Sequence, residues 1–370
     1  MKLDSQLHIT PGKPFTVLQL TDMQVIDADQ RRSPDRLRQD EIDAWKTENV
    51  EICAYTPIRA VVEKTNPDLI IITGDLVYGE FDDSGRALAG FIAFMESFGI
   101  PWAPVFGNHD CESKIGVYAQ CRMLEKAPNC LFRRSTTLTG NSNYSIGIYE
   151  GETLVRVLYM LDSNGCWGAT DPDTTRHHGM EDDQIAWMTA TAADLREKNG
   201  RPIPGFACFH IPSEDYITAL IDAGYQDAED ADGGNYIIAG TSPASKIDAD
   251  TPSPNTCEEG NPETVLSPAS EGDSGYKNER MGRGAFQKAR SAEFLASDVD
   301  GVFMGHCHKC QVSVLGKDGI RYTHGVKSGT YDYHTRGRIG GTKITVSEDR
   351  KTFAVEQVYV LSMMTVPGYK

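Results

Sequence analysis

The sequence contains no apolar run long enough to cross a membrane. A spanning helix needs about 18 or more consecutive apolar residues, and no such stretch occurs. The N-terminal segment, MKLDSQLHITPGKPF, also lacks the apolar region of a secretory signal. As it stands, the sequence therefore predicts a cytoplasmic protein without a membrane partner. A signal peptide removed ahead of residue 1 would leave the same sequence, and would predict a secreted or periplasmic protein instead.

Positive charge is also scarce. The chain has 36 Lys and Arg against 53 Asp and Glu, a formal net charge of −17. Because proteins bind nucleic-acid backbones largely through Lys and Arg, this balance argues against a nucleic-acid partner. It does not exclude a small phosphorylated substrate, since bound cations can attract an anion through an acidic surface. The sequence leaves the oligomeric state open.

Cysteine is present but does not form a compact framework. The nine cysteines are odd in number and loosely spread along the chain, which favours reduced thiols over a set of disulfides.

What the chain does have is a series of short apolar runs that end in polar residues able to bind a metal. Each run reads as a buried strand followed by a turn. In open α/β sheets, ligands bind beyond the carboxyl ends of the strands, so these side chains can meet at one point. We therefore expect a metal site, for two ions. The runs are FTVLQL before Asp22, LIII before Asp75, WAPVF before Asn108, His109 and Asp110, GFACF before His210, and GVFM before His306 and His308.

The spacing of these runs predicts an α/β fold in one domain. Strands ending at residue 20 and covering 69–73 and 102–106 alternate with helices within 40–64 and over 86–98, which is a βαβ pattern. The later segments predict an antiparallel strand pair over 143–161, a helix over 180–199 ended by Gly200, and further strands near the C-terminus. Because the candidate ligands run from Asp22 to His308, a domain boundary between them would divide the site. We expect a single domain over residues 1–370.

Two polar segments interrupt this pattern. Residues 241–284 are rich in Ser, Pro, Asp, Glu and Gly and predict a surface insertion. Residues 27–38 leave the first ligand strand and could contact a substrate anion, although a solvated loop is favoured. Exposed loop positions are likewise favoured for His177 and His178, and structural roles for His324 and His334. The basic residues of the 27–38 loop are Arg31, Arg32, Arg36 and Arg38.

Taken in order, the motifs LTDMQ, GDLVY, GNHD, FACFH and GHCH resemble the calcineurin-like metallophosphoesterase superfamily. The resemblance spans most of the chain. It implies a four-layer αββα sandwich of two mixed β-sheets, with a dinuclear metal centre at the carboxyl ends of the strands. Carried over residue by residue, it implies that Asp22 and His308 bind the first ion and that Asp75 bridges both. The implied ligands of the second ion are Asn108, His210 and His306.

The residue types suit this chemistry. Two ions about 3.5–4 Å apart can bind phosphoryl oxygens, convert a bridging water to hydroxide and assist an in-line displacement. Carboxylate, imidazole and amide ligands fit Fe, Mn or Zn. His109 is the candidate for stabilising the transition state or protonating the leaving oxygen. Asp110 is expected to orient His109 through a hydrogen bond.

The first motif departs from the pattern of the superfamily, most of which has Asp-x-His where this chain has Gln24. Two residues could complete the first metal position. Gln24 could bind through its amide oxygen, or Tyr78 could bind through its phenolate. The second arrangement resembles the Gly-Asp-x-x-Tyr motif of purple acid phosphatases, which bind iron(III).

These observations predict a metal-dependent hydrolase of phosphoric esters, with a phosphomonoesterase favoured over a phosphodiesterase. The alternative of another class is a scaffold of the same fold that has lost catalysis. Loss of Asn108, His109 or a histidine of GHCH would indicate the scaffold, and all of them are present.

Overall fold

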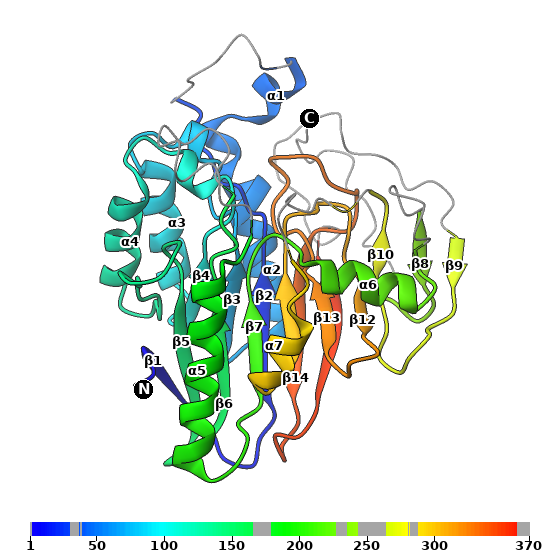
Figure 1. Cartoon of the computed structure of the whole chain (residues 1–370). Helices are drawn as coiled ribbons and strands as arrows, with labels where there is room; N and C mark the ends of the chain where they lie inside the picture. Colours follow the sequence, from blue (N-terminus) through cyan, green and yellow to red (C-terminus); the bar gives the residue numbers. More distant parts are fainter. Residues whose placement is uncertain are drawn as a thin grey trace.

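The computed structural model describes residues 2–29, 37, 39–165, 179–226, 235–242, 264–279, 281 and 288–360. Its strands form two large mixed sheets and one small sheet (Figure 1). The first large sheet has the strand order β15-β14-β2-β3-β4. Its strands are β2 (Phe15–Leu20), β3 (Leu69–Thr73), β4 (Trp102–Val105), β14 (Gly340–Val346) and β15 (Phe353–Tyr359).

The second large sheet has seven strands in the order β1-β5-β6-β7-β11-β13-β12. Its centre is parallel, since β6, β7, β11 and β13 pair in parallel, whereas β5 and β6 form the expected antiparallel pair. The strands are β1 (Ser5–Ile9), β5 (Tyr144–Glu150), β6 (Thr153–Met160), β7 (Gly205–Cys208), β11 (Val299–Met304), β12 (Ser313–Leu315) and β13 (Arg321–His324).

Helices complete four layers. The α-helices are α1 (Gln39–Ala44), α2 (Thr56–Thr65), α3 (Arg86–Glu96), α4 (Val117–Lys126), α5 (Asp182–Asn199), α6 (Glu214–Asp222) and α7 (Ser291–Ala296). In Figure 1, α5 and α7 lie over the face of the sheet that contains β7. The shorter helices are η2 (Thr47–Asn49), the π-helix η3 (Glu51–Tyr55), η4 (Gly79–Phe81) and η5 (Asp110–Glu112).

Alternating side chains explain the layers. Phe206 and Phe303 point into a core that also holds Val17, Ile72 and residues of α2 and α3. Their strand neighbours Ala207 and Val302 point the other way, into a second core with residues of α5, α6 and α7. Because successive side chains of a strand face opposite sides, one apolar strand serves both cores. The expected αββα sandwich of two mixed sheets is confirmed.

The βαβ pattern of the first third is confirmed as well. Strands β2, β3 and β4 are parallel neighbours, and parallel neighbours need a crossover, which α2 and α3 supply. Helix α5 ends at Gly200, whose φ of 65° is left-handed, as its sequence predicts.

The polar segment 241–284 is less irregular than expected. In its described part, β9 (Thr264–Leu266) and β10 (Tyr276–Lys277) pair with β8 (Tyr236–Ile238) in a three-stranded sheet. Tyr276 and Lys277 are buried. Bridges from Ser274 to Ser313 and from Lys277 to Cys310 join this small sheet to the chain after the GHCH motif. Strands of two or three residues carry too little periodicity to be seen in a sequence.

Two further expectations are affected. The prediction of reduced thiols is wrong at Cys111, which forms a disulfide. Disulfide pairing depends on which distant segments the fold brings together, and the spacing of cysteines in a sequence does not show this. Among the sequence candidates that lie outside the described residues are Arg31, Arg32, Arg36, Arg38, His177 and His178.

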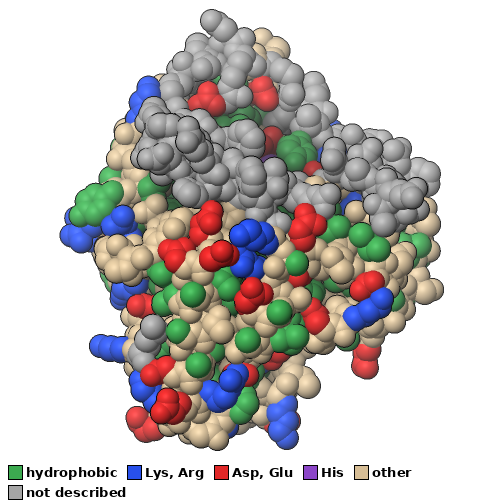
Figure 2. Space-filling model, viewed as in Figure 1, with side chains coloured by type: hydrophobic (Ala, Val, Ile, Leu, Met, Phe, Trp, Pro, Cys, Tyr) green, Lys and Arg blue, Asp and Glu red, His purple; other side chains and the backbone are tan. Residues whose placement is uncertain are grey.

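The surface agrees with the charge balance of the sequence. On the face in Figure 2, described acidic and basic side chains are interspersed, without an extended basic area among them. Within the described ranges, no helix is long and apolar enough to span a membrane.

Candidate metal centre

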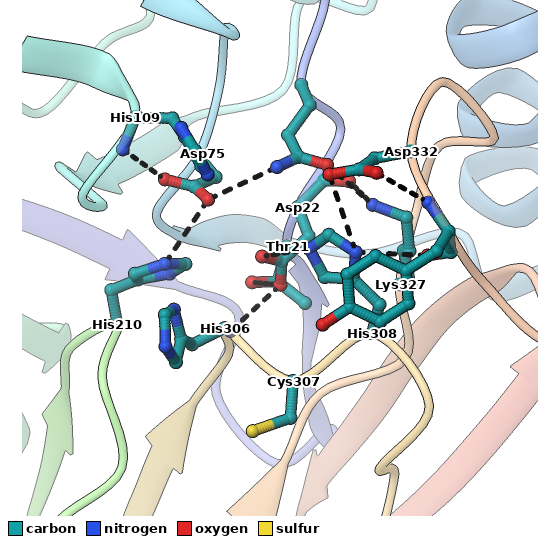
Figure 3. A network of polar contacts seen from close by, with 12 residues as sticks. Thr21, Asp22, Asp75, His109, His210, His306, Cys307, His308, Lys327 and Asp332 are labelled. Atoms are coloured by element: carbon teal, nitrogen blue, oxygen red, sulfur yellow. Dashed lines mark hydrogen bonds and ion pairs between the residues drawn. The ribbon is translucent and has the colours of Figure 1, made fainter. Parts of the chain in front are cut away.

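The polar residues that follow five strands come together at one edge of the sandwich. Asp22, Asp75 and the GNHD motif follow β2, β3 and β4 of one sheet, whereas His210 and the GHCH motif follow β7 and β11 of the other. Figure 3 shows the side chains of Asp22, Asp75, His210, His306 and His308 gathered around one point. Asp22, Asp75 and His210 are buried, and each offers a ligand atom within 4.8 Å of those of the other two.

Three of the candidate ligands have a left-handed backbone conformation, which sets the direction of their side chains. Asp22, Asp75 and His306 have φ values of 55°, 53° and 84°, a region that non-glycine residues rarely adopt. Such a residue costs about 1–3 kcal/mol and persists only where its surroundings hold it. Here the two aspartate turns hold each other, because the Asp22 amide donates to the Gly74 carbonyl at 3.1 Å and the Gln24 amide to the Asp75 carbonyl at 2.9 Å.

Glycines beside the ligands let the turns approach closely. A Cβ at Gly74 would lie 2.4 Å from His210 Nδ1, and one at Gly305 would lie 2.0 Å from Thr21 Oγ1. Any larger residue at either position would displace a ligand or its support. The glycine before Asp75 and the glycine before His306 are therefore required by the packing of the centre.

Hydrogen bonds to backbone carbonyls fix two of the imidazoles. His210 Nδ1 donates to the Thr73 carbonyl at 2.7 Å, and His308 Nδ1 donates to the Tyr333 carbonyl at 3.0 Å. In the neutral ring, each Nε2 is then a lone-pair acceptor. This is the arrangement by which proteins orient metal-binding histidines.

The Nε2 atoms of His210 and His308 face side-chain oxygens, which are also hydrogen-bond acceptors. His210 Nε2 lies 3.1 Å from Asn108 Oδ1 and 3.4 Å from Asp75 Oδ2. His308 Nε2 lies 3.4 Å from Asp22 Oδ1, which has no hydrogen-bond partner within the described part of the chain. A proton or a metal ion between these lone pairs would offset their mutual repulsion. Carboxylate, imidazole and amide donors converging in this way fit the two ions expected from the sequence.

In the absence of metal ions, the charges around His210 favour its protonated form. Burial lowers the pKa of His210, but the carboxylate of Asp75 outweighs it and raises the pKa to about 9. The neighbouring His306 behaves oppositely, because burial and the charge on His210 lower its pKa to about 3. Its Nδ1 lies 3.0 Å from Asn108 Oδ1. A metal ion entering the centre has to displace the His210 proton.

His109 lies at the edge of the centre. Its backbone amide donates to Asp75 Oδ1 at 3.0 Å, so the residue is tied to the ligand set through its main chain. Its ring Nδ1 lies 3.1 Å from Glu112 Oε1. Burial lowers the pKa of His109, but Asp75 and Glu112 together raise it to about 10. In the absence of metal ions, these two carboxylates thus favour the protonated form of His109, the form that a proton donor needs.

Asp110 does not orient His109 as expected. Its carboxylate accepts three backbone amides, from Gly107 at 2.7 Å, Asp75 at 3.0 Å and Val77 at 3.0 Å. Asp110 thus fastens the GNHD turn to the GDLV turn, and Glu112 is the carboxylate beside the imidazole. The expected role of Asp110 is wrong because the 3₁₀ turn η5 brings residues three apart together, which places Glu112 and not the adjacent Asp110 beside the ring of His109.

Tyr78 packs against His109. Their ring centroids are 4.3 Å apart with the planes tilted by 30°, and Trp45 and Phe81 pack around Tyr78 at 5.6 and 5.4 Å. The phenol ring is thus beside the centre, on the side of His109.

Lys327 is a residue of the centre that the sequence did not reveal. Its Nζ donates to the Asp22 carbonyl at 2.8 Å and to Gln24 Oε1 at 2.9 Å. Lysine usually lies at the surface, and this one is in a GVKSG segment without any recognisable pattern. Nothing in the sequence could have indicated that it is buried beside Asp22.

His324 and His334 have the structural roles expected of them. His324 Nε2 accepts the Cys307 amide at 3.0 Å, which supports the turn between His306 and His308. Burial lowers the pKa of His324 to about 4, so this acceptor is unprotonated at neutral pH. His334 Nδ1 donates to the Asp332 carbonyl at 2.9 Å.

The chain matches a known protein family over most of its length. A family model described as calcineurin-like phosphoesterase matches residues 15–310. The chain is 28% identical over 177 residues to "Probable inactive purple acid phosphatase 29" of Arabidopsis thaliana, covering 43% of this chain and 45% of that protein. It is 42% identical over 177 residues to "Probable inactive purple acid phosphatase 28" of the same plant, covering 42% and 44%.

Two further similarities complete the comparison. The chain is 30% identical over 183 residues to "Phosphatase DCR2" of Saccharomyces cerevisiae, covering 45% of this chain and 31% of that protein. The matches thus span less than half of the relatives' length. Among solved structures, a dimetal phosphatase from Danio rerio matches with a TM-score of 0.42 and 12% identity, covering 94% of this chain and 100% of that one.

Proposed function

Because the chain belongs to the calcineurin-like phosphoesterase family, we propose that it is a phosphomonoesterase with a dinuclear metal centre. The observation that carries the proposal is the convergence of buried acceptors at Asp22, Asp75 and His210. Asp22 and His308 would hold the first ion, Asn108, His210 and His306 the second, and Asp75 would bridge them. When bound, two such ions supply positive charge for the phosphoryl oxygens and for activation of the attacking water.

The protein itself would supply a proton donor, His109, and the residues that orient it. Glu112 lies beside Nδ1 of His109, and the Tyr78 ring packs on the imidazole. These contacts leave Nε2 of His109 as the donor to the leaving oxygen. Proton transfer of this kind contributes roughly 10²- to 10⁴-fold to a rate.

Hydrolysis assays test the proposal. Metal-stripped protein is reloaded with Mn²⁺, Zn²⁺ or iron and assayed on p-nitrophenyl phosphate and on bis(p-nitrophenyl) phosphate. We expect turnover that depends on the metal and favours the monoester. Preference for the bis ester would make the protein a phosphodiesterase.

An inactive scaffold is the second candidate, and the names of the two Arabidopsis relatives favour it. Against it stand the six proposed ligands and His109, which are all present in this chain. Absence of turnover of either ester by metal-loaded protein would decide for the scaffold.

Replacing Glu112 should impair the proton donor without removing metals. Glu112→Gln removes the carboxylate charge beside His109, so we expect kcat to fall roughly tenfold or more, with KM and metal content unchanged. The matched control is Glu125→Gln, because Glu125 pairs with Arg122 on the surface of α4. Equal rates for the two variants would show that Glu112 has no part in positioning His109.

Tyr78 can be tested as an iron ligand by colour. A phenol has a pKa near 10 and becomes an anion at neutral pH only when a strongly Lewis-acidic ion such as iron(III) binds it. If Tyr78 completes the first position, iron-loaded protein should absorb visible light and Tyr78→Phe should abolish the band. Tyr55→Phe is the control, since Tyr55 stacks on Phe94 instead. A colourless iron-loaded protein would remove Tyr78 from the ligand set.

A further inference from the structure

We propose that Lys327 is a positioning residue that locks Gln24 and the Asp22 turn for metal binding, an inference that rests on the proposed dinuclear centre. Lys327 lies between β13 and β14, and only 1% of it is exposed. Its Nζ donates to two oxygens of the same turn, the Asp22 carbonyl and Gln24 Oε1 (Figure 3 labels Lys327 and Asp22).

The contact with Lys327 determines which end of Gln24 faces the centre. Because Oε1 accepts from Lys327 at 2.9 Å, the amide nitrogen points toward Asp75, with Nε2 3.5 Å from Asp75 Oδ2. Gln24 therefore offers an N–H donor to the bridging carboxylate. Its oxygen accepts from Lys327, so in this arrangement the amide nitrogen, not the oxygen, is the end nearer Asp75.

The turn that Lys327 holds needs external support. Asp22 and Gln24 have φ values of 55° and 49°, so two non-glycine residues of one short turn are left-handed. The residues after Lys327 also contact the turn that contains Asp22 and Gln24. The Ser328 amide donates to the Thr21 carbonyl at 2.9 Å, and Ser328 Oγ accepts the Thr21 amide at 3.1 Å. A Cβ at Gly329 would lie 2.5 Å from the Met23 carbonyl oxygen, which shows how closely the two segments pass.

A positioning role of Lys327 and a purely electrostatic role predict opposite effects on metal affinity when Lys327 is replaced. An ammonium group that acted only through its charge would repel cations, so its removal would tighten metal binding. Among the described residues, however, the hydrogen bonds of Nζ go to two uncharged oxygens, one of them the backbone of Asp22 itself. Loss of Lys327 should free both Gln24 and the strained turn, and should therefore weaken metal binding.

Equilibrium dialysis with Mn²⁺ tests the inference. Removing groups that support metal ligands typically weakens binding by 10- to 100-fold, and we expect a loss of about that size for Lys327→Met at one of two sites. Lys327→Gln keeps an N–H donor and should give a smaller loss. Gln24→Met should resemble Lys327→Met, and the double variant should be no weaker than the worse single variant, because the two residues act as one unit. Lys343→Met, on β14, is the control, and thermal unfolding monitors the fold.

The outcomes separate this inference from the proposed function. Wild-type protein that binds no Mn²⁺ would refute the dinuclear centre itself. Wild-type protein that binds two ions, with unchanged or tighter binding in Lys327→Met, would overturn only the role of Lys327. Additive losses in the double variant would do the same, because they would show that Gln24 contributes independently. If Lys327→Met does not fold, the comparison of Lys327→Gln with Gln24→Met decides in the same way.

Discussion

Asp75→Asn should leave the protein with fewer than two metal ions per chain and lower its turnover of phosphate esters by at least about 10²-fold. The substitution keeps the shape of the side chain but removes the charge that would join two cations. Asp75 also offers a ligand atom within 4.8 Å of those of Asp22 and His210, the proposed ligands of the first and the second ion.

Metal analysis after dialysis measures the effect directly. Asp68→Asn is the matched control, because Asp68 precedes the same strand β3 and accepts the Thr16 amide at its opposite end. The control should retain both ions and full activity. An Asp75→Asn protein that also retained both would place the bridge elsewhere.

His109→Asn should lower kcat by roughly 10²- to 10⁴-fold while the metals stay in place. The metals should stay because His109 contacts Asp75 through its backbone amide, which asparagine also provides. The loss should be smaller for esters with good leaving groups, since these need less help from a proton donor.

A series of aryl phosphates of increasing leaving-group pKa measures this dependence. His8→Asn is the control, because His8 is on β1 and stacks on Tyr149. Equal losses across the series would contradict proton donation and would indicate that His109 acts by electrostatic stabilisation of the transition state.

The sequence predicted those parts of the molecule that depend on short stretches of chain. Runs such as LIII and GVFM are buried strands, and the polar residue after each lies at the common edge, because parallel strands end at the same side of a sheet. Asp22, Asp75 and His210 could therefore be grouped before their distances were known.

The sequence could not show contacts that depend on loop conformation. Asp110 accepts backbone amides of Gly107, Asp75 and Val77, and amides carry no sequence signal. Lys327 reaches a turn about 300 residues away in the chain, which the folding of distant segments brings near. The role of Glu112 depends on the helical turn η5, which is too short to have a pattern.

The dependence of phosphatase activity on bound metal tests the central claim most directly. Metal-stripped protein is titrated with Mn²⁺, and turnover of p-nitrophenyl phosphate is measured at each ratio of metal to protein. A dinuclear centre held by Asp22, Asp75, Asn108, His210, His306 and His308 predicts activity that reaches its plateau at two ions per chain. A plateau at one ion, or no turnover at any ratio, would contradict it.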